Sequence, residues 1–173
     1  MDSKNFILAA EKKSLELTVD IQRFEVSVSD PRVINAVLER KDIKISDRKL
    51  KLNSSNESYF VRFACYNNPG FQWDQESFNN ALLDEDEAIR LLALTKGGNC
   101  KLSEAMILVL LSDRDEEVRL ELVSRNEFIS NDEFVSIGLK DESEYVVDRV
   151  VKARSFYEQR ELKTIILRTR HYE

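Results

Sequence analysis

Few side chains in this sequence have the types and spacing that catalysis needs. His171, the only histidine, is the third residue from the C-terminus of the 173-residue chain. A Ser-His or Cys-His dyad would therefore depend on a terminal segment that we expect to fray. The two cysteines, Cys65 and Cys100, fall in a predicted helix and a predicted turn. Two scattered thiols are typical of a reducing compartment, so we predict a cytoplasmic location. Because no catalytic set can be recognised, we predict no catalytic residue and a non-enzymatic protein.

Clustered carboxylates offer the strongest chemical alternative, which is metal binding. Residues 84–87 read Asp-Glu-Asp-Glu, but they stand where a helix is predicted to begin. Acidic side chains at that position favour the exposed backbone N–H groups and the helix dipole, so capping explains them without a metal ion. Gly97-Gly98 follows a helix and lacks the Gly-Lys-Ser/Thr continuation of a phosphate-binding loop, which indicates a helix C-cap. The sequence therefore predicts neither a metal site nor a cofactor.

The elements that would position a surface site follow a repeating pattern. An acidic turn and an apolar helix recur in DEDEAIRLLAL from Asp84, DRDEEVRLELV from Asp113 and DESEYVVDRVV from Asp141. One apolar position of the helix keeps the same spacing and extends it one repeat earlier: Val61, Ile89, Val118 and Val146. A period of about 28 residues predicts an all-α array of stacked helical hairpins in which these residues face inward.

Helix start signals place the two helices of each hairpin. Ser29-Asp30-Pro31 is predicted to open a first helix at residues 31–39, and Asp74 is predicted to cap a second helix. An apolar residue followed by Ser marks further starts of second helices. These pairs are Ile45-Ser46, Leu102-Ser103 and Ile129-Ser130.

The two ends of the array are predicted from weaker patterns. Residues 1–28 are expected to form a helical cap behind Ser3, although alternation over residues 15–28 leaves a β-hairpin as the alternative. Phe128 and Phe156 are separated by the same repeat period, which predicts a last second helix at residues 158–168. Its inward residues would be Leu162 and Ile166, and its outward residues Arg160, Lys163 and Arg168.

The spacing Asp-x4-Ile/Val-Arg in residues 84–90 and 113–119, with the Asn68-Pro69 turn, resembles the HEAT-like and variant leucine-rich repeat families. The resemblance covers residues 29–168 of a single domain spanning 1–173, with 169–173 as a tail. It implies a right-handed superhelix of about five stacked hairpins, in which repeated Asp and Arg residues pair between neighbouring repeats. Scaffold roles would then fall to Arg62, Arg90 and Arg119, whereas Asn35 and Val147 depart from the pattern.

Charge is distributed unevenly along the chain. Residues 74–144 hold 7 Lys+Arg against 18 Asp+Glu, a net charge of −11. Residues 1–73 hold 12 Lys+Arg against 10 Asp+Glu, and residues 145–173 hold 7 against 4. Such an acidic block repels phosphate backbones and anionic membranes and attracts basic proteins. The bland alternative is that these charges only keep the protein soluble.

We therefore expect a protein-binding module that contacts a basic partner, as a monomer or a 1:1 heterodimer. Its size and charge resemble those of bacterial immunity proteins, which suggests an inhibitor of a basic effector such as a nuclease toxin. The alternatives are an assembly scaffold and a DNA glycosylase of the HEAT-like type, which the acidic block disfavours. The predicted partner-binding residues are Asp84, Glu85, Asp86, Asp113, Asp115, Glu116, Glu117, Asp141 and Glu142, with Phe71 and Trp73 as apolar anchors.

Overall fold

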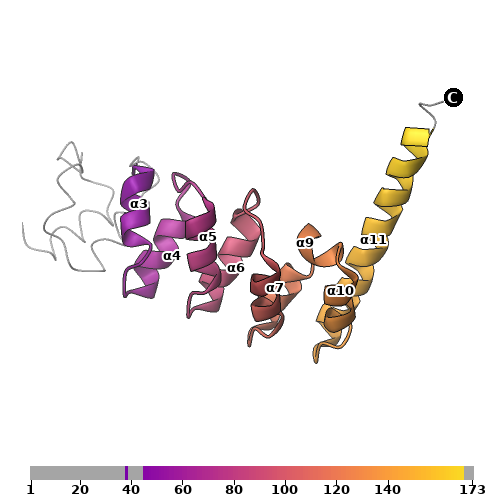
Figure 1. Cartoon of the computed structure of the whole chain (residues 1–173). Helices are drawn as coiled ribbons and strands as arrows, with labels where there is room; N and C mark the ends of the chain where they lie inside the picture. The colour runs from indigo at the N-terminus through magenta and orange to yellow at the C-terminus, as the bar shows by residue number, and fades with distance from the viewer. Residues whose placement is uncertain (1–37, 39–44, 170–173) are drawn as a thin grey trace, which may run out of the picture. The chain divides into compact units, whose positions relative to one another are not determined.

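The computed structural model describes residue 38 and residues 45–169, and within this range every regular element is an α-helix. In chain order the helices are α3 (Asp47–Asn53), α4 (Tyr59–Asn67), α5 (Gln75–Leu82), α6 (Glu87–Lys96), α7 (Glu104–Leu111), α8 (Glu116–Leu122), α9 (Asn126–Ile129), α10 (Asp132–Gly138) and α11 (Glu144–Thr169). The prediction of an all-α protein is confirmed for this range (Figure 1). The predicted N-terminal cap and nearly all of the helix at 31–39 lie outside the described residues.

The predicted register is also confirmed. The four apolar residues that recur once per repeat are each the third residue of a helix, in α4, α6, α8 and α11. All four are fully buried: Val61, Ile89, Val118 and Val146. We call α4, α6, α8 and α11 first helices, and α3, α5, α7 and α10 second helices. Since identical positions carry the same packing role, the hairpin is the repeating unit of the described chain.

The chain divides into two compact units, residues 1–93 and residues 94–173. In the first unit α3 packs against α4, and the core contains Leu50, Phe78 and Leu82. Asp74 begins α5 with a capping box, in which its carboxylate accepts the backbone N–H of Ser77 at 2.9 Å. This confirms Asp74 as the predicted cap, and the two reciprocal bonds satisfy backbone donors that a helix start leaves open.

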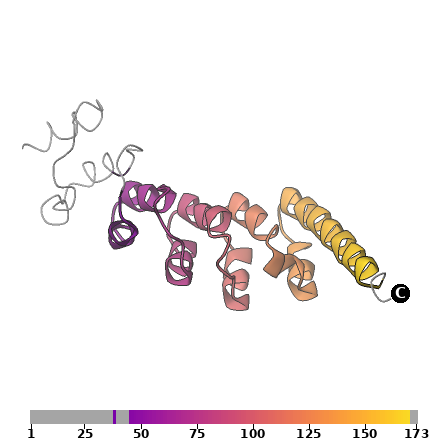
Figure 2. The ribbon, with the colours of Figure 1, turned by 90° about the horizontal axis from the view of Figure 1, so that it is seen from above.

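In the second unit the second helices α7 and α10 contact each other, and α11 contacts α8, α9 and α10. Figure 2 shows α11 running along one side of this unit. The core is built from Ile107, Leu110, Leu122 and Phe128, all almost completely buried. Ser103 caps α7 as predicted, because its hydroxyl accepts the N–H of Met106 at 3.2 Å.

Two predicted boundaries are wrong in this unit. The cap of α10 is Asn131 rather than Ser130, since residues 126–129 form a helical turn of their own. The last hairpin does not form, because α11 continues without a turn to Thr169. Consequently Phe156 is 69% exposed, although its predicted equivalent Phe128 is fully buried, and Leu162 is 60% exposed rather than inward. No Gly, Pro or Asn interrupts residues 144–169, so nothing in the sequence stops the helix.

Gly138 provides a test of packing in the second unit. A Cβ atom at this position would lie 2.8 Å from Cζ of Phe128 and 3.0 Å from Cγ2 of Val150. We expect Gly138→Ala to lower the free energy of unfolding by about 1 kcal/mol, because overpacking costs about 1–3 kcal/mol and outweighs the gain in helix propensity. Urea unfolding measures the change. The matched control is Gly98→Ala, whose Cβ would meet nothing within 4 Å, and equal stability of the two variants would contradict the prediction.

Candidate functional site

The acidic segments form the turns that precede the first helices. In each turn a side-chain oxygen accepts the backbone N–H two residues later, at 2.9–3.0 Å. The four acceptors are Asn56, Asp84, Asp113 and Asp141. A short side chain with an acceptor oxygen is what such a turn requires, and this explains why Asp or Asn recurs at this position.

Two of these aspartates also bind an arginine of the preceding first helix. In the first unit Arg62 donates from Nε and Nη2 to Asp84 at 2.8 and 2.9 Å. In the second unit Arg119 makes the same bidentate contact with Asp141 at 2.9 and 3.1 Å. The four side chains are at most 9% exposed. The hydrogen bond to the aspartate is the main reason why the pKa of each arginine is raised above its ordinary value.

The remaining guanidinium nitrogen holds the arginine's own turn. Nη1 of Arg62, Arg90 and Arg119 donates to the carbonyl six residues earlier in the chain, at 3.0, 2.8 and 2.7 Å. The prediction that these arginines bond to carboxylates or carbonyls of adjacent turns is therefore confirmed. Each of them is a scaffold residue.

The residue after each paired aspartate has the opposite exposure. Glu85 and Glu142 are 82% and 89% exposed, and each still lies within 3.0–3.5 Å of the buried guanidinium. The aspartates belong to the scaffold, and the adjacent glutamates face solvent, where a partner can reach them. The structure therefore separates Asp84 and Asp141 from Glu85 and Glu142, which the sequence had grouped together.

The other predicted acidic residues fall between these extremes. Asp86 and Asp115 are half-buried, and each accepts a backbone N–H at the start of its helix, at 3.0 and 3.1 Å. Asp113 and Glu116 are half-buried, and Glu117 is exposed. We define the acidic edge of the first unit as residues 84–87, and that of the second unit as residues 113–117 and 141–144. In the second unit both turns lie on the same side (Figure 1).

A shallow depression of about 430 Å³ opens between the two turns of the second unit. Leu111 and Ile137 form its apolar wall, and Arg114 and Lys140 stand beside them. Its charged lining balances three acidic side chains, Asp113, Asp141 and Glu142, against three basic ones, Arg114, Arg119 and Lys140. The depression itself therefore has no strong preference for the charge of a ligand.

The predicted aromatic anchors pack within their own hairpin. Phe71 is only 5% exposed and meets Tyr66 edge to face, with ring centroids 5.1 Å apart. Trp73 stacks on Tyr66 at 5.2 Å and is half-buried. Phe71 is thus a core residue of the turn between α4 and α5, and Trp73 presents at most one side of its ring to a partner.

A second series of polar contacts was missed by sequence reasoning. At the end of a first helix, Arg125 donates to the carbonyls of Leu94 and Cys100 at 3.3 and 2.9 Å. Arg154 donates to the carbonyl of Ile129 at 3.1 Å, and Asn68 to that of Leu38 at 3.1 Å. The signal was present, because Arg125 and Arg154 are one repeat apart in the sequence. In the sequence they were explained as positive charges that favour the C-terminal end of a helix dipole, but in the structure they join consecutive repeats.

Metal-binding groups and reactive thiols were sought among the described residues. Among them, no group of three or more His, Cys, Asp or Glu side chains could hold a metal ion. Burial raises the pKa of the Cys65 thiol to about 12, so it stays protonated and unreactive. No described helix combines the length and apolar content that crossing a membrane requires.

Comparison with protein-family models, with curated proteins and with solved structures finds no match for this chain. The resemblance to HEAT-like repeats stays a prediction.

The arginine–aspartate pair can be tested by truncation. Arg119→Ala leaves Asp141 buried without its partner, so we expect a loss of about 3 kcal/mol in the free energy of unfolding. Thermal and urea unfolding followed by circular dichroism measure the loss. Arg114→Ala, at an exposed position in the same unit, serves as the control and should change stability by less than about 0.5 kcal/mol. An unchanged melting temperature for Arg119→Ala would show that the pair is not part of the scaffold.

The protonated state of Cys65 predicts slow thiol chemistry. In a Cys100→Ser background at about pH 8, the remaining thiol should react with a disulfide reagent about 100-fold more slowly in the native protein than in denaturant, because it is buried and protonated. Absorbance of the released thiolate gives both rates. Equal rates would mean that Cys65 is accessible and ionised, and would reopen a role as a nucleophile.

Proposed function

We propose that this chain is a non-enzymatic binding module that docks a basic protein through its acidic edges. The observation that carries the proposal is the exposure of Glu85 and Glu142 beside the buried arginine–aspartate pairs. Each exposed glutamate lies within a turn whose backbone is held by a hydrogen bond between the residues on either side of it, so its charge is already positioned before a partner arrives. Preorganised charge of one sign favours rapid and selective encounter with the opposite sign.

The acidic block extends this local arrangement. Residues 74–144 carry 18 acidic and 7 basic side chains, net −11, and two strongly exposed acids of this block, Glu85 and Glu142, lie in the turns. A cationic cleft on a partner would be attracted over a distance of about one Debye length, ~8 Å at physiological ionic strength. Arg62 and Arg119 do not neutralise the exposed glutamates, because the single positive charge of each arginine is already balanced by a buried aspartate.

A nuclease toxin is the kind of partner that fits best, and the module would act as its immunity protein. An enzyme that binds a polynucleotide presents a basic cleft, and a rigid acidic protein can occlude that cleft without chemistry. The two buried cysteines form no disulfide, which supports a cytoplasmic location. An assembly scaffold is the alternative that the stacked hairpins favour, because repeats provide extended surfaces for several partners.

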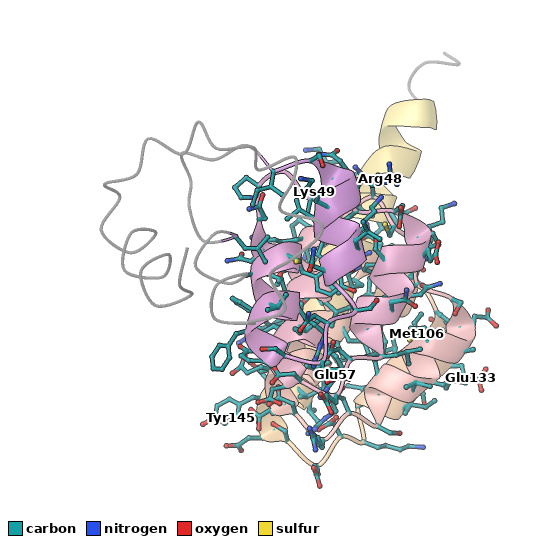
Figure 3. The ribbon with its side chains drawn as sticks, turned by 90° about the vertical axis from the view of Figure 1, so that its left-hand side faces the viewer. Arg48, Lys49, Glu57, Met106, Glu133 and Tyr145 are labelled. Carbon is teal, nitrogen blue, oxygen red and sulfur yellow. The ribbon has the colours of Figure 1, made fainter. Side chains whose placement is uncertain are left out.

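Charge reversal on the acidic edges tests the proposal. Glu85→Lys, Glu117→Lys and Glu142→Lys change exposed residues that cap no helix, whereas Asp86 and Asp115 must be kept because they do. The matched control reverses Glu76, Glu104 and Glu133, exposed acids at the starts of second helices. Figure 3 shows Glu133 projecting outward from α10. Both variants change the net charge equally. Because Glu85 and Glu142 also contact buried arginines, circular dichroism and thermal unfolding of both variants accompany the binding comparison.

The two variants are compared with the wild type as bait for the partner and then in stopped-flow binding to the purified partner. We expect a basic protein whose association with the edge variant is about tenfold slower at low salt, with a flatter salt dependence, because exposed charges govern association rate. The control variant should bind within about twofold of the wild type. If both variants slowed association equally, net charge rather than the acidic edges would govern binding. An acidic partner would contradict the proposal.

A test of nuclease inhibition distinguishes an immunity protein from an assembly scaffold. An immunity protein should abolish the nuclease activity of the captured partner at a 1:1 ratio, whereas a scaffold should leave enzymatic activity unchanged.

A further inference from the structure

Helix α11 extends well past the helices that pack against it. It has 26 residues, and its N-terminal part contacts α8, α9 and α10. Arg154 marks the end of that packing, with bonds to the carbonyl of Ile129 at 3.1 Å and to Asp132 at 2.8 Å. Beyond it, Ser155, Phe156 and residues 158–163 are all exposed. Figures 1 and 2 show the helix, in yellow, projecting beyond α10.

Basic residues form a stripe along this helix with Phe156 at its centre. Relative to Phe156 they occupy positions −7, −4, +4 and +7, and all of them are exposed: Arg149, Lys152, Arg160 and Lys163. At about 100° per residue these positions lie within ~40° of Phe156 around the helix, over a length of about 21 Å. The Phe156 side chain is 69% exposed. We call these five residues the basic stripe.

The acidic residues of the helix lie away from the stripe. Glu158 and Glu161 are two and five positions after Phe156, which places them about 140–160° away from it around the helix axis. Glu158 is bound to Arg154, with Nε to Oε1 at 2.7 Å. Beyond Phe156 the acids therefore lie on the opposite side of the helix from the stripe, whereas before it Asp148 lies about 80° from Phe156 around the axis and pairs with Lys152.

We propose that the basic stripe binds a single-stranded polynucleotide, with a base stacked on Phe156 and phosphates held by the cations on both sides. An exposed aromatic ring flanked by positive charge is the arrangement that recognises single strands without reading their sequence, because every base has a π-face. Lys152 and Arg160 are each about 6 Å along the axis from Phe156. A strand running along the helix would therefore meet charge immediately before and after the stacked base.

Two other occupants fit the stripe less well. A membrane surface needs a continuous apolar face, but the exposed Val151 and Leu162 lie about 120–140° from Phe156 around the helix. A second copy pairing through the same helix in a two-fold arrangement would place the stripe against an identical stripe, and like charges would repel.

The acidic edge of the same unit does not cancel the attraction. Phe156 is twelve positions beyond Glu144, a distance of about 18 Å along the helix. This exceeds the Debye length of about 8 Å at physiological salt. The stacking position at Phe156 is therefore screened from the acidic edge, whereas Arg149, five positions after Glu144, is about 7.5 Å from it along the helix and is not. This inference stands whether or not the acidic edges bind a basic protein.

Fluorescence anisotropy of labelled RNA and DNA oligonucleotides of about 15 nucleotides, within the usual range of single-strand site sizes, tests the proposal with the full chain. Four phosphate contacts predict a slope of log K against log salt of about −3. Lys152→Gln with Arg160→Gln should bring the slope to about −1.5, and Phe156→Ala should weaken binding about tenfold. Lys101→Gln with Lys140→Gln removes the same charge from exposed positions off the stripe and should change affinity by less than about twofold.

Circular dichroism verifies that each variant keeps its helices, which is expected because the changed side chains are exposed. Tighter binding of RNA than of DNA, or the reverse, would identify the source of the strand. No binding at about 50 mM salt, equal binding by Phe156→Ala, or equal loss in the off-stripe control would overturn the proposal. So would a preference for duplex over single strands. Two further measurements identify another occupant if the oligonucleotide does not bind. Co-sedimentation with phosphatidylserine vesicles that depends on the stripe residues would assign the stripe to a membrane. Self-association in sedimentation velocity that depends on the same residues would assign it to a second copy.

Discussion

The bidentate arginine–aspartate contact is the interaction that joins neighbouring repeats at two places in the described chain. It joins a first helix to the turn that starts the next first helix, in Arg62–Asp84 and in Arg119–Asp141. A buried ion pair repays its desolvation only when its remaining polar atoms are also bonded. Here the third guanidinium nitrogen reaches the carbonyl at the start of the arginine's own turn, and the aspartate also accepts a turn N–H. Turn, helix and neighbouring repeat are thus held by one connected set of bonds.

The chemical character of the surface follows from this set of bonds. The side chain of the aspartate that closes the turn is buried, whereas the next residue, Glu85 or Glu142, reaches the outer side of the same guanidinium and stays exposed to solvent. Arg125, which follows α8, and Arg154, within α11, reach back to carbonyls of the preceding hairpin. In these two repeats polar contacts therefore lie on both sides of the buried Val118 and Val146. A rigid acidic surface results from the way in which the repeats are joined.

Much of this architecture could be predicted from periodicity, because a residue that recurs once per hairpin must meet the same environment each time. That argument placed Val61, Ile89, Val118 and Val146 inward correctly, whereas the bonding of Arg62, Arg90 and Arg119 was expected from the resemblance to HEAT-like repeats. It could not say which carboxylate of an acidic run is buried, since Asp84 and Glu85 differ only by one methylene and by turn geometry. It also failed at Phe156, because matching spacing to Phe128 does not supply the breaker that ends a helix. The contacts of Arg125 and Arg154 were hidden for a similar reason, since a basic residue at a helix end already has a local explanation in the dipole.

The step from Ile89 to Val118 is one position longer than the steps on either side of it, and this difference has a single origin. Both paired arginines lie 22 residues before their aspartates, and Asp84 and Asp113 each precede an arginine by six. The extra residue falls between Lys96 and the cap Ser103, seven positions apart, whereas Asn68 to Asp74 and Arg125 to Asn131 are six. At Gly98 in this loop an added side chain would meet open space. The loop therefore carries the one extra residue of the longer repeat, and because it lies between the two arginine–aspartate pairs, its length does not alter the spacing within either pair.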